Sequence, residues 1–117
     1  MTRRSLSPRL GVDLIELDKA RVFYRRHRRT LSSFLTAGEA GYVRRGPELP
    51  HVRLARLLAA KEAVFKASER GVWMGPSGFR STALDARGER LFYQGRPVRF
   101  IDSRRYVAAV YGDTRRS

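Results

Sequence analysis

Three charged side chains stand close together in the segment LLAAKEAVFKA, residues 57–67. At about 100° per residue, Lys61 falls inside the apolar arc of a helix, Glu62 lies at the edge of that arc, and Lys66 follows one turn later. An unpaired ammonium group in a hydrophobic core is costly, so Lys61 needs compensation. The apolar arc itself is formed by Leu54, Leu57, Leu58, Val64 and Phe65. If this arc borders a cleft, Lys61 could contact an anionic ligand bound there.

The same three side chains also have simpler interpretations. The stem of Lys61 can lie along apolar surface while its ammonium group reaches water. Glu62 and Lys66, at i and i+4, can form an ordinary surface ion pair. The helix alone leaves these alternatives open.

A second carboxylate interrupts an apolar run near the start of the chain. The run LGVDLIEL, residues 10–17, is rich in Val, Ile and Leu and predicts a buried strand, in which Asp13 requires a partner. Mg²⁺ typically takes one or two protein carboxylates and completes its shell with water and phosphate oxygens. Asp13 and Glu62 could therefore hold Mg²⁺ on a diphosphate, with Lys61 and Lys66 balancing the remaining negative charge.

Helices predicted along the first half of the chain must position these groups. Helical spacing follows the first strand within residues 18–35, and Thr36 and Glu39 have the spacing of a capping box that begins a short helix. Pro50 suits the first turn of the longest helix, which we expect from about His51 to about Glu69. Gly71 suits its C-terminal cap.

Short strands are predicted in the second half of the chain. Four segments are bounded by turn residues and read as antiparallel strands: 79–85, 89–94, 97–102 and 105–112. We therefore expect a single α+β domain over residues 1–117, with one long helix packed on a small antiparallel sheet. Residues 1–9 and 113–117 are expected to be frayed tails.

Composition limits the class of protein. The 117-residue chain has a formal net charge of +14 and no cysteine, which excludes disulfides and thiolate metal sites. No stretch approaches the roughly 18 apolar residues of a membrane span. Acidic residues interrupt the apolar run that follows the first arginines, so we expect no signal peptide and a cytoplasmic protein. The charge indicates a polyanionic partner or a solvated arginine-rich surface.

Three motifs in register resemble the phosphopantetheinyl transferases of the holo-acyl-carrier-protein synthase type. The run GVDLIEL resembles the Gly-(Ile/Val)-Asp start of that family, and LAAKEAVFKA resembles its Ala-x-Lys-Glu-Ala-x-x-Lys-Ala helix. Between them, SSFLTAGEAGYVRR is similar to the family's Leu-Thr-x-x-Glu-x-x-Tyr segment. Order and separation match across roughly residues 10–85.

This resemblance implies a fold, an activity and a set of site residues. The family transfers 4′-phosphopantetheine from coenzyme A to a serine of an acyl carrier protein and releases 3′,5′-ADP. Asp13 and Glu62 would then bind Mg²⁺, Lys66 would stabilise the transferred phosphoryl group, and Lys61 would contact a coenzyme A phosphate. Gly71 is the glycine retained from the family's Gly-Thr-Gly after the helix. The serine proton would pass to Glu62 or to a metal-bound water.

The resemblance also implies partners. Carrier proteins are acidic, so a basic surface would dock them by electrostatic steering. Relatives are commonly homotrimers with coenzyme A at the subunit interface. The expected docking residues are Lys19, Arg21, Arg25, Arg26, Arg28 and Arg29.

Several positions depart from the family pattern. Leu57 occupies the place of a frequent arginine, with Arg56 one position away, and Lys19 replaces another arginine. The family's further helix before the last strand pair is missing. A family member that binds a carrier protein, or acts on a carrier-bound intermediate, without coenzyme A is therefore an alternative.

A nucleic-acid-binding domain is a third hypothesis. The segment FYRRHRR mixes aromatic and basic residues, and three aromatics of the predicted strands could stack bases. These are Tyr93, Phe100 and Tyr106. Core packing is the favoured interpretation of these rings, and nucleic acid is the less favoured partner.

Overall fold

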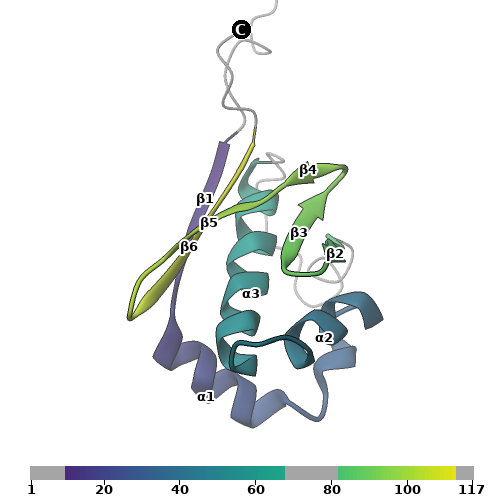
Figure 1. Cartoon of the computed structure of the whole chain (residues 1–117), viewed down its shortest axis with the longest axis vertical. Helices are drawn as coiled ribbons and strands as arrows, with labels where there is room; N and C mark the ends of the chain where they lie inside the picture. Colours follow the sequence, from purple (N-terminus) through teal and green to yellow (C-terminus); the bar gives the residue numbers. More distant parts are fainter. Residues whose placement is uncertain (1–9, 68–81, 113–117) are drawn as a thin grey trace, which may run out of the picture.

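The computed structural model describes residues 10–67 and 82–112. Three α-helices and six strands follow one another in the described chain (Figure 1). In order they are β1 (Leu10–Glu16), α1 (Leu17–His27), the short 3₁₀ helix η2 (Leu31–Ser33), α2 (Ala37–Arg44), α3 (Pro50–Ala67), β2 (Asp85–Arg87), β3 (Arg90–Tyr93), β4 (Arg96–Pro97), β5 (Arg99–Asp102) and β6 (Tyr106–Gly112). The predicted tails, Glu69 and Gly71 lie outside the described residues. The expected α+β class is confirmed.

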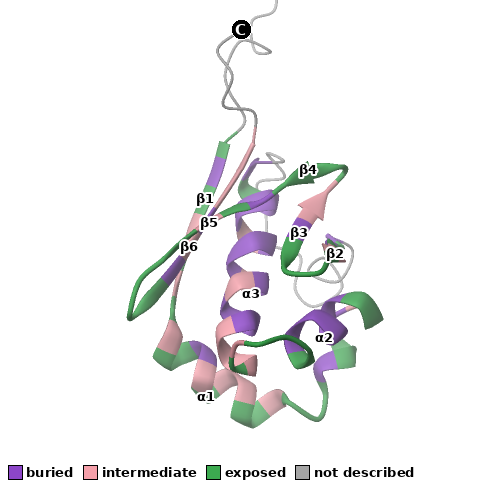
Figure 2. Ribbon diagram, in the orientation of Figure 1, coloured by how far each residue is buried: buried purple, intermediate pink, exposed green. Residues whose placement is uncertain are grey.

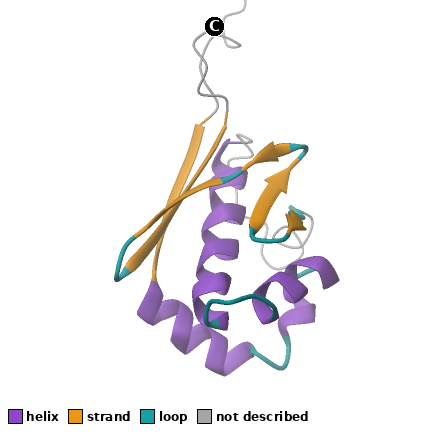
Figure 3. Cartoon of the chain, viewed as in Figure 1, coloured by secondary structure: helices purple, strands orange, loops and turns teal. Residues whose placement is uncertain are grey.

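Helix α3 is the centre of the domain. It lies between a sheet that contains β1 and β6 and, on its other side, α2 and β3, while α1 crosses its lower end (Figures 1 and 3). Figure 2 shows most of α3 in the colour of buried residues. The predicted apolar arc is buried except for Leu58, which is half-buried. Burial also extends around the helix to five alanines, whose small side chains allow close packing: Ala55, Ala59, Ala60, Ala63 and Ala67.

Strand β1 forms a three-stranded antiparallel sheet in the order β1-β6-β5. It packs on α3 through Gly11, where a methyl group would come within 1.7 Å of the Ala63 carbonyl oxygen. Side chains of a strand alternate between its two faces, so Asp13, two residues after Gly11, also lies on the face toward α3. The prediction that the whole run is buried was wrong, because Val12 and Leu14 lie on the outer face and are exposed.

The strands of the second half divide between two sheets. β2, β3 and β4 form a second antiparallel sheet, whereas β5 and β6 join β1. Gln94 and Gly95 connect β3 to β4 with positive φ at both residues, as a type I′ hairpin turn requires. Between β4 and β5, the buried Val98 donates its amide hydrogen to Leu91, so the chain passes directly from one sheet to the other.

Helix α2 begins as its sequence predicts. Glu39 donates its amide hydrogen to the Thr36 hydroxyl oxygen, and Thr36 donates its own amide hydrogen to the Glu39 carboxylate. The capping box is therefore complete on both sides. None of the helices within residues 10–67 and 82–112 combines the length and apolar character needed to cross a membrane.

Candidate active site

Asp13 and Lys66 meet where β1 crosses the last turns of α3. The Lys66 ammonium donates to Asp13 Oδ1 at 2.9 Å and to the Val12 carbonyl oxygen at 3.3 Å. The Asp13 side chain is 15% exposed and that of Lys66 is 51% exposed. The carboxylate in the strand therefore has a partner, and this partner remains open to solvent.

Glu62 belongs to the same cluster. Burial raises the pKa of the half-buried Glu62, the negative charge of Asp13 raises it further, and the positive charge of Lys66 opposes both effects. Two carboxylates from elements about 50 residues apart thus act on one another electrostatically. Lys66 of α3 forms its ion pair with Asp13 of β1. An ordinary surface ion pair between Glu62 and Lys66 therefore does not describe the cluster.

Local structure explains why these three side chains converge. Glu62 and Lys66 are one helical turn apart and lie on the same side of α3. Gly11 brings β1 against that side at Ala63, and Asp13 follows on the same strand face. The spacing Gly-x-Asp on the strand and Glu-x-x-x-Lys on the helix therefore becomes a single site.

The carboxylates of the cluster suit a hard divalent cation that is also bound by the phosphates of a ligand. Asp13 and Glu62 supply carboxylate oxygens, the ligands that Mg²⁺ prefers, and two carboxylates in proximity gain from a cation between them. Within the part of the chain that the structure describes, no group of three or more His, Cys, Asp or Glu side chains could hold a metal ion. An ion here would complete its shell with water and phosphate oxygens.

Lys61 lies elsewhere, although it precedes Glu62 in the sequence. Its side chain is 0% exposed, and its ammonium group donates to Glu39 Oε2 at 2.8 Å and to the Thr82 carbonyl oxygen at 2.7 Å. The expected contact of Lys61 with a coenzyme A phosphate does not fit this placement, because the ammonium group is enclosed among internal acceptors. The interpretation in which it reaches water is wrong for the same reason.

The positions that depart from the family pattern are also accounted for. Leu57 is fully buried in the core. Arg56 pairs with Asp102 of β5 at 2.8 Å and with Glu48 at 3.2 Å. Arg56 is therefore occupied in holding the N-terminal half of α3 to its neighbours. Gly71 lies outside the described residues.

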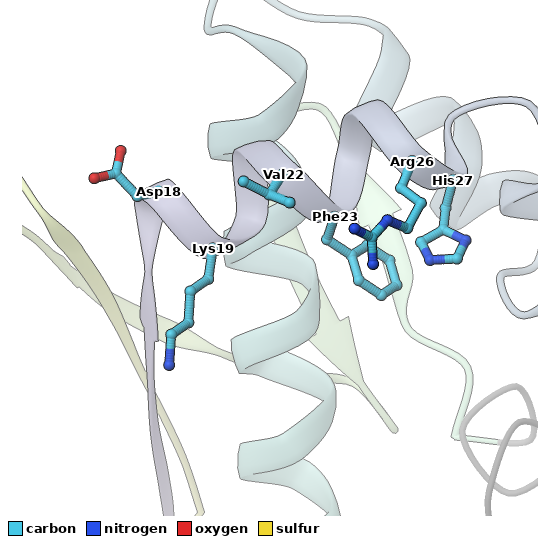
Figure 4. A pocket seen from close by; sticks show the side chains of 6 residues that line it. All are labelled: Asp18, Lys19, Val22, Phe23, Arg26 and His27. Atoms are coloured by element: carbon cyan, nitrogen blue, oxygen red, sulfur yellow. The ribbon is translucent and has the colours of Figure 1, made fainter.

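The predicted docking residues gather on and just after α1. Five of the six are exposed, and Arg21 is half-buried and pairs with Asp18 at 3.0 Å. An open hollow of about 360 Å³ runs along this helix, with Lys19 and Arg26 among its lining side chains (Figure 4). Its other lining residues are Asp18, Val22, Phe23 and His27. The surface thus combines basic groups with an apolar centre.

The aromatic residues proposed for base stacking share no surface. Phe100 packs against the core, and the Tyr93 ring packs edge-on against Tyr111 at 5.8 Å. Tyr106 lies opposite Glu16 on the outer face of the first sheet. This arrangement agrees with core packing for Tyr93 and Phe100.

Glu39 is the residue whose importance the sequence did not reveal. The capping-box spacing identified its bonds to Thr36 but gave no indication of its pairing with Lys61. The sequence feature that could have indicated this pairing is the lysine in an apolar arc, because a buried ammonium group requires a carboxylate partner from another element.

Comparison with known proteins assigns the family. A search of curated proteins gives no significant match. A family model for the 4′-phosphopantetheinyl transferase superfamily, ACPS, matches residues 9–111 and so includes β1, α3 and both motifs of the cluster. The chain therefore belongs to the 4′-phosphopantetheinyl transferase superfamily, a family of transferases.

Proposed function

We propose that the protein transfers 4′-phosphopantetheine from coenzyme A to a serine of an acidic acyl carrier protein and requires Mg²⁺. The observation that carries this proposal is the convergence of Asp13, Glu62 and Lys66 at the junction of β1 and α3. Family membership supplies the reaction class. The cluster supplies groups suited to a diphosphate and its cation.

The reaction breaks a phosphoric anhydride bond of coenzyme A and forms a phosphate ester on the carrier serine. The serine oxygen forms a bond to the phosphorus that carries the pantetheine, the bond from this phosphorus to the bridging oxygen breaks, and 3′,5′-ADP leaves. Asp13 and Glu62 would hold Mg²⁺, which neutralises diphosphate charge and orients the phosphates. The serine proton would pass to Glu62 or to a metal-bound water.

Lys66 would stabilise the transferred phosphoryl group. Its side chain is half exposed and its ammonium nitrogen lies 2.9 Å from Asp13 Oδ1, so the ammonium group can turn to a phosphate oxygen without leaving the cluster. An ammonium group placed where negative charge develops lowers the barrier of phosphoryl transfer. Lys61 has no part in this step.

The basic surface of α1 suits the acidic carrier protein. Lys19 and Arg26 border the hollow, and exposed Val22 offers apolar contact between them. Opposite charge accelerates the encounter, and the apolar centre adds area removed from water.

A homotrimer is part of the proposal. The outer face of the β1-β6-β5 sheet exposes large apolar side chains, among them Leu14 at 58% and Ile101 at 66%. Contiguous exposed apolar surface on a small domain supports association with another protein surface. The other large exposed apolar side chains of this face are Leu10, Val12 and Tyr106.

Mass spectrometry of an apo carrier protein tests the proposed activity. Incubation with coenzyme A, Mg²⁺ and the wild-type protein should add the mass of phosphopantetheine to the carrier. The Asp13→Asn variant and a sample with a chelator should add none. Absence of a mass gain with several carriers, alongside an active control transferase, would refute the proposal.

A family member that recognises a carrier protein without coenzyme A is the second candidate. Lys61, which was expected to contact a coenzyme A phosphate, is buried in the core, and so is Leu57, which stands at the place of a frequent family arginine. Calorimetry separates the two candidates. Binding of a holo or acylated carrier with no heat from coenzyme A plus Mg²⁺ supports this second function.

A further inference from the structure

A fully buried ion pair joins α2 to α3 next to the candidate active site. The side chains of Glu39 and Lys61 are both 0% exposed, and the ammonium nitrogen lies 2.8 Å from Glu39 Oε2. Removing two charges from water is unfavourable unless hydrogen bonds satisfy the remaining polar atoms. The surroundings of this pair meet that condition.

Glu39 holds three parts of the chain at once. Its Oε1 accepts the amide hydrogen of Thr36, and its Oε2 accepts the amide hydrogen of Leu84 at 2.7 Å in addition to the lysine. Lys61 also donates to the Thr82 carbonyl oxygen. The pair therefore fixes the first turn of α2, the C-terminal half of α3 and the chain that enters β2 to one another.

The contacts of this pair lie on one side of α3, and the candidate active site lies on another. Successive helical residues point about 100° apart, so Lys61 faces α2 while Glu62 points toward β1. Side-chain atoms lie roughly 5–6 Å from a helix axis, and a rotation of about 10° moves the Glu62 carboxylate by roughly 1 Å. A displacement of about 1 Å in a catalytic constellation can reduce activity about 100-fold.

We propose that Glu39 and Lys61 are positioning residues that set the rotation of α3 and thereby the approach of Glu62 to Asp13. Neither side chain touches the ligand; they act through the helix that carries Glu62 and Lys66. Gly11 fixes the opposite side of α3 by its contact with Ala63. The proposal rests on the proposed function for its catalytic consequence, but its structural consequence is measurable without any ligand.

A double variant separates positioning from stability. Glu39→Gln combined with Lys61→Met removes both charges, nearly preserves side-chain volume and leaves no unpaired buried ion. The matched control is Arg56→Met with Asp102→Asn, which removes another ion pair between α3 and a neighbouring element. Thermal unfolding establishes that each variant is folded.

Two readouts then decide the proposal. In the ligand-free protein, the double variant should shift the backbone amide resonances of Gly11, Asp13 and Lys66, none of which is next to a substituted residue in the sequence. The enhancement of coenzyme A binding by Mg²⁺ should fall about 10- to 100-fold, as on loss of supporting groups behind metal ligands. The control variant should change neither readout.

A folded double variant with wild-type resonances at these three amides and unchanged dependence on Mg²⁺ would overturn the proposal. If the wild-type protein binds no coenzyme A, the proposed function fails, and the amide resonances still decide whether the pair positions the helix. If the double variant does not fold, Glu39→Asp retains the charge and shortens the side chain. That variant should shift the same three amides, and unchanged resonances would again overturn the proposal.

Discussion

Gly11 lies in direct contact with the backbone of Ala63, and no larger residue fits at this point of β1. A methyl group on Gly11 would come within 1.7 Å of the Ala63 carbonyl oxygen and 2.8 Å of the Ala67 amide nitrogen. Because both obstacles are backbone atoms of α3, the strand would have to move away from the helix. Asp13 would then move away from Glu62.

Gly11→Ala should therefore impair both stability and the site. We expect a loss of at least about 1–3 kcal/mol in the free energy of unfolding, as for overpacking, and a weaker effect of Mg²⁺ on coenzyme A binding. Gly38→Ala is the matched control, since nothing lies within 4 Å of its added methyl group in α2. It should be neutral or stabilising by up to about 1 kcal/mol. Equal stability of the two variants in denaturant titrations would contradict the close contact.

Glu62→Gln should stabilise the metal-free protein at neutral pH. The pKa of Glu62 is raised above its ordinary value of 4.5, so the folded state binds this proton more tightly than the unfolded state does. The stability contributed by Glu62 consequently falls as pH rises from about 4.5 through the raised pKa. Glutamine carries no charge at any pH and escapes this loss. Melting temperatures across this window should diverge as pH rises, with the variant higher.

Lys66→Met should destabilise the metal-free protein at neutral pH, the opposite of the effect expected for Glu62→Gln. Loss of the opposing positive charge should raise the pKa of Glu62 further and lower the melting temperature at neutral pH. A melting temperature of Glu62→Gln at or below that of the wild type at neutral pH would contradict the raised pKa of Glu62.

Charge removal on α1 should slow the association with an acidic carrier protein. Lys19→Gln with Arg26→Gln should lower the association rate constant roughly tenfold at low salt, and the difference should shrink as salt rises. Arg87→Gln with Arg90→Gln is a control of equal charge change on the exposed β2–β3 hairpin. Stopped-flow kinetics measure these rate constants. An equal decrease of the association rate constant in both variants would show that net charge, and not the α1 surface, attracts the carrier.

Disruption of the outer sheet face should dissociate the proposed homotrimer. Leu14→Glu and Ile101→Glu place charges on this face, on the two strands that flank β6, whereas Leu49→Glu changes a similarly exposed leucine in the segment before α3. Sedimentation velocity should show a trimer for the wild type and for Leu49→Glu, and monomers for the other two. A wild-type monomer at micromolar concentration would rule out this assembly.

The elements were predictable where local chemistry determines them. The Thr36–Glu39 capping box and the proline in the first turn of α3 are local signals, and both helices begin there. The division of the strands between two sheets was not predictable, since it depends on β1 pairing with β6 about 95 residues later. Exposure of Val12 and Leu14 was also missed, because an apolar run does not reveal whether its outer face is covered.

The candidate site was predictable in part. The family motifs and the isolated carboxylate of the strand identified Asp13, Glu62 and Lys66, and the structure brings these three together. The environment of Lys61 was not predictable from its helix, because its partner Glu39 is 22 residues away and only tertiary packing joins them. A lysine in an apolar arc indicates that a carboxylate is needed but not which one.

Calorimetric titration of coenzyme A with and without Mg²⁺ tests most directly whether Asp13 and Glu62 form a metal site on a diphosphate. The wild-type protein should bind coenzyme A at least about tenfold more tightly with Mg²⁺, and Asp13→Asn should bind it equally weakly in both buffers. Wild-type affinity that is the same with Mg²⁺ and with a chelator, or an Asp13→Asn variant that keeps the Mg²⁺ effect, would contradict the proposed role of these two carboxylates.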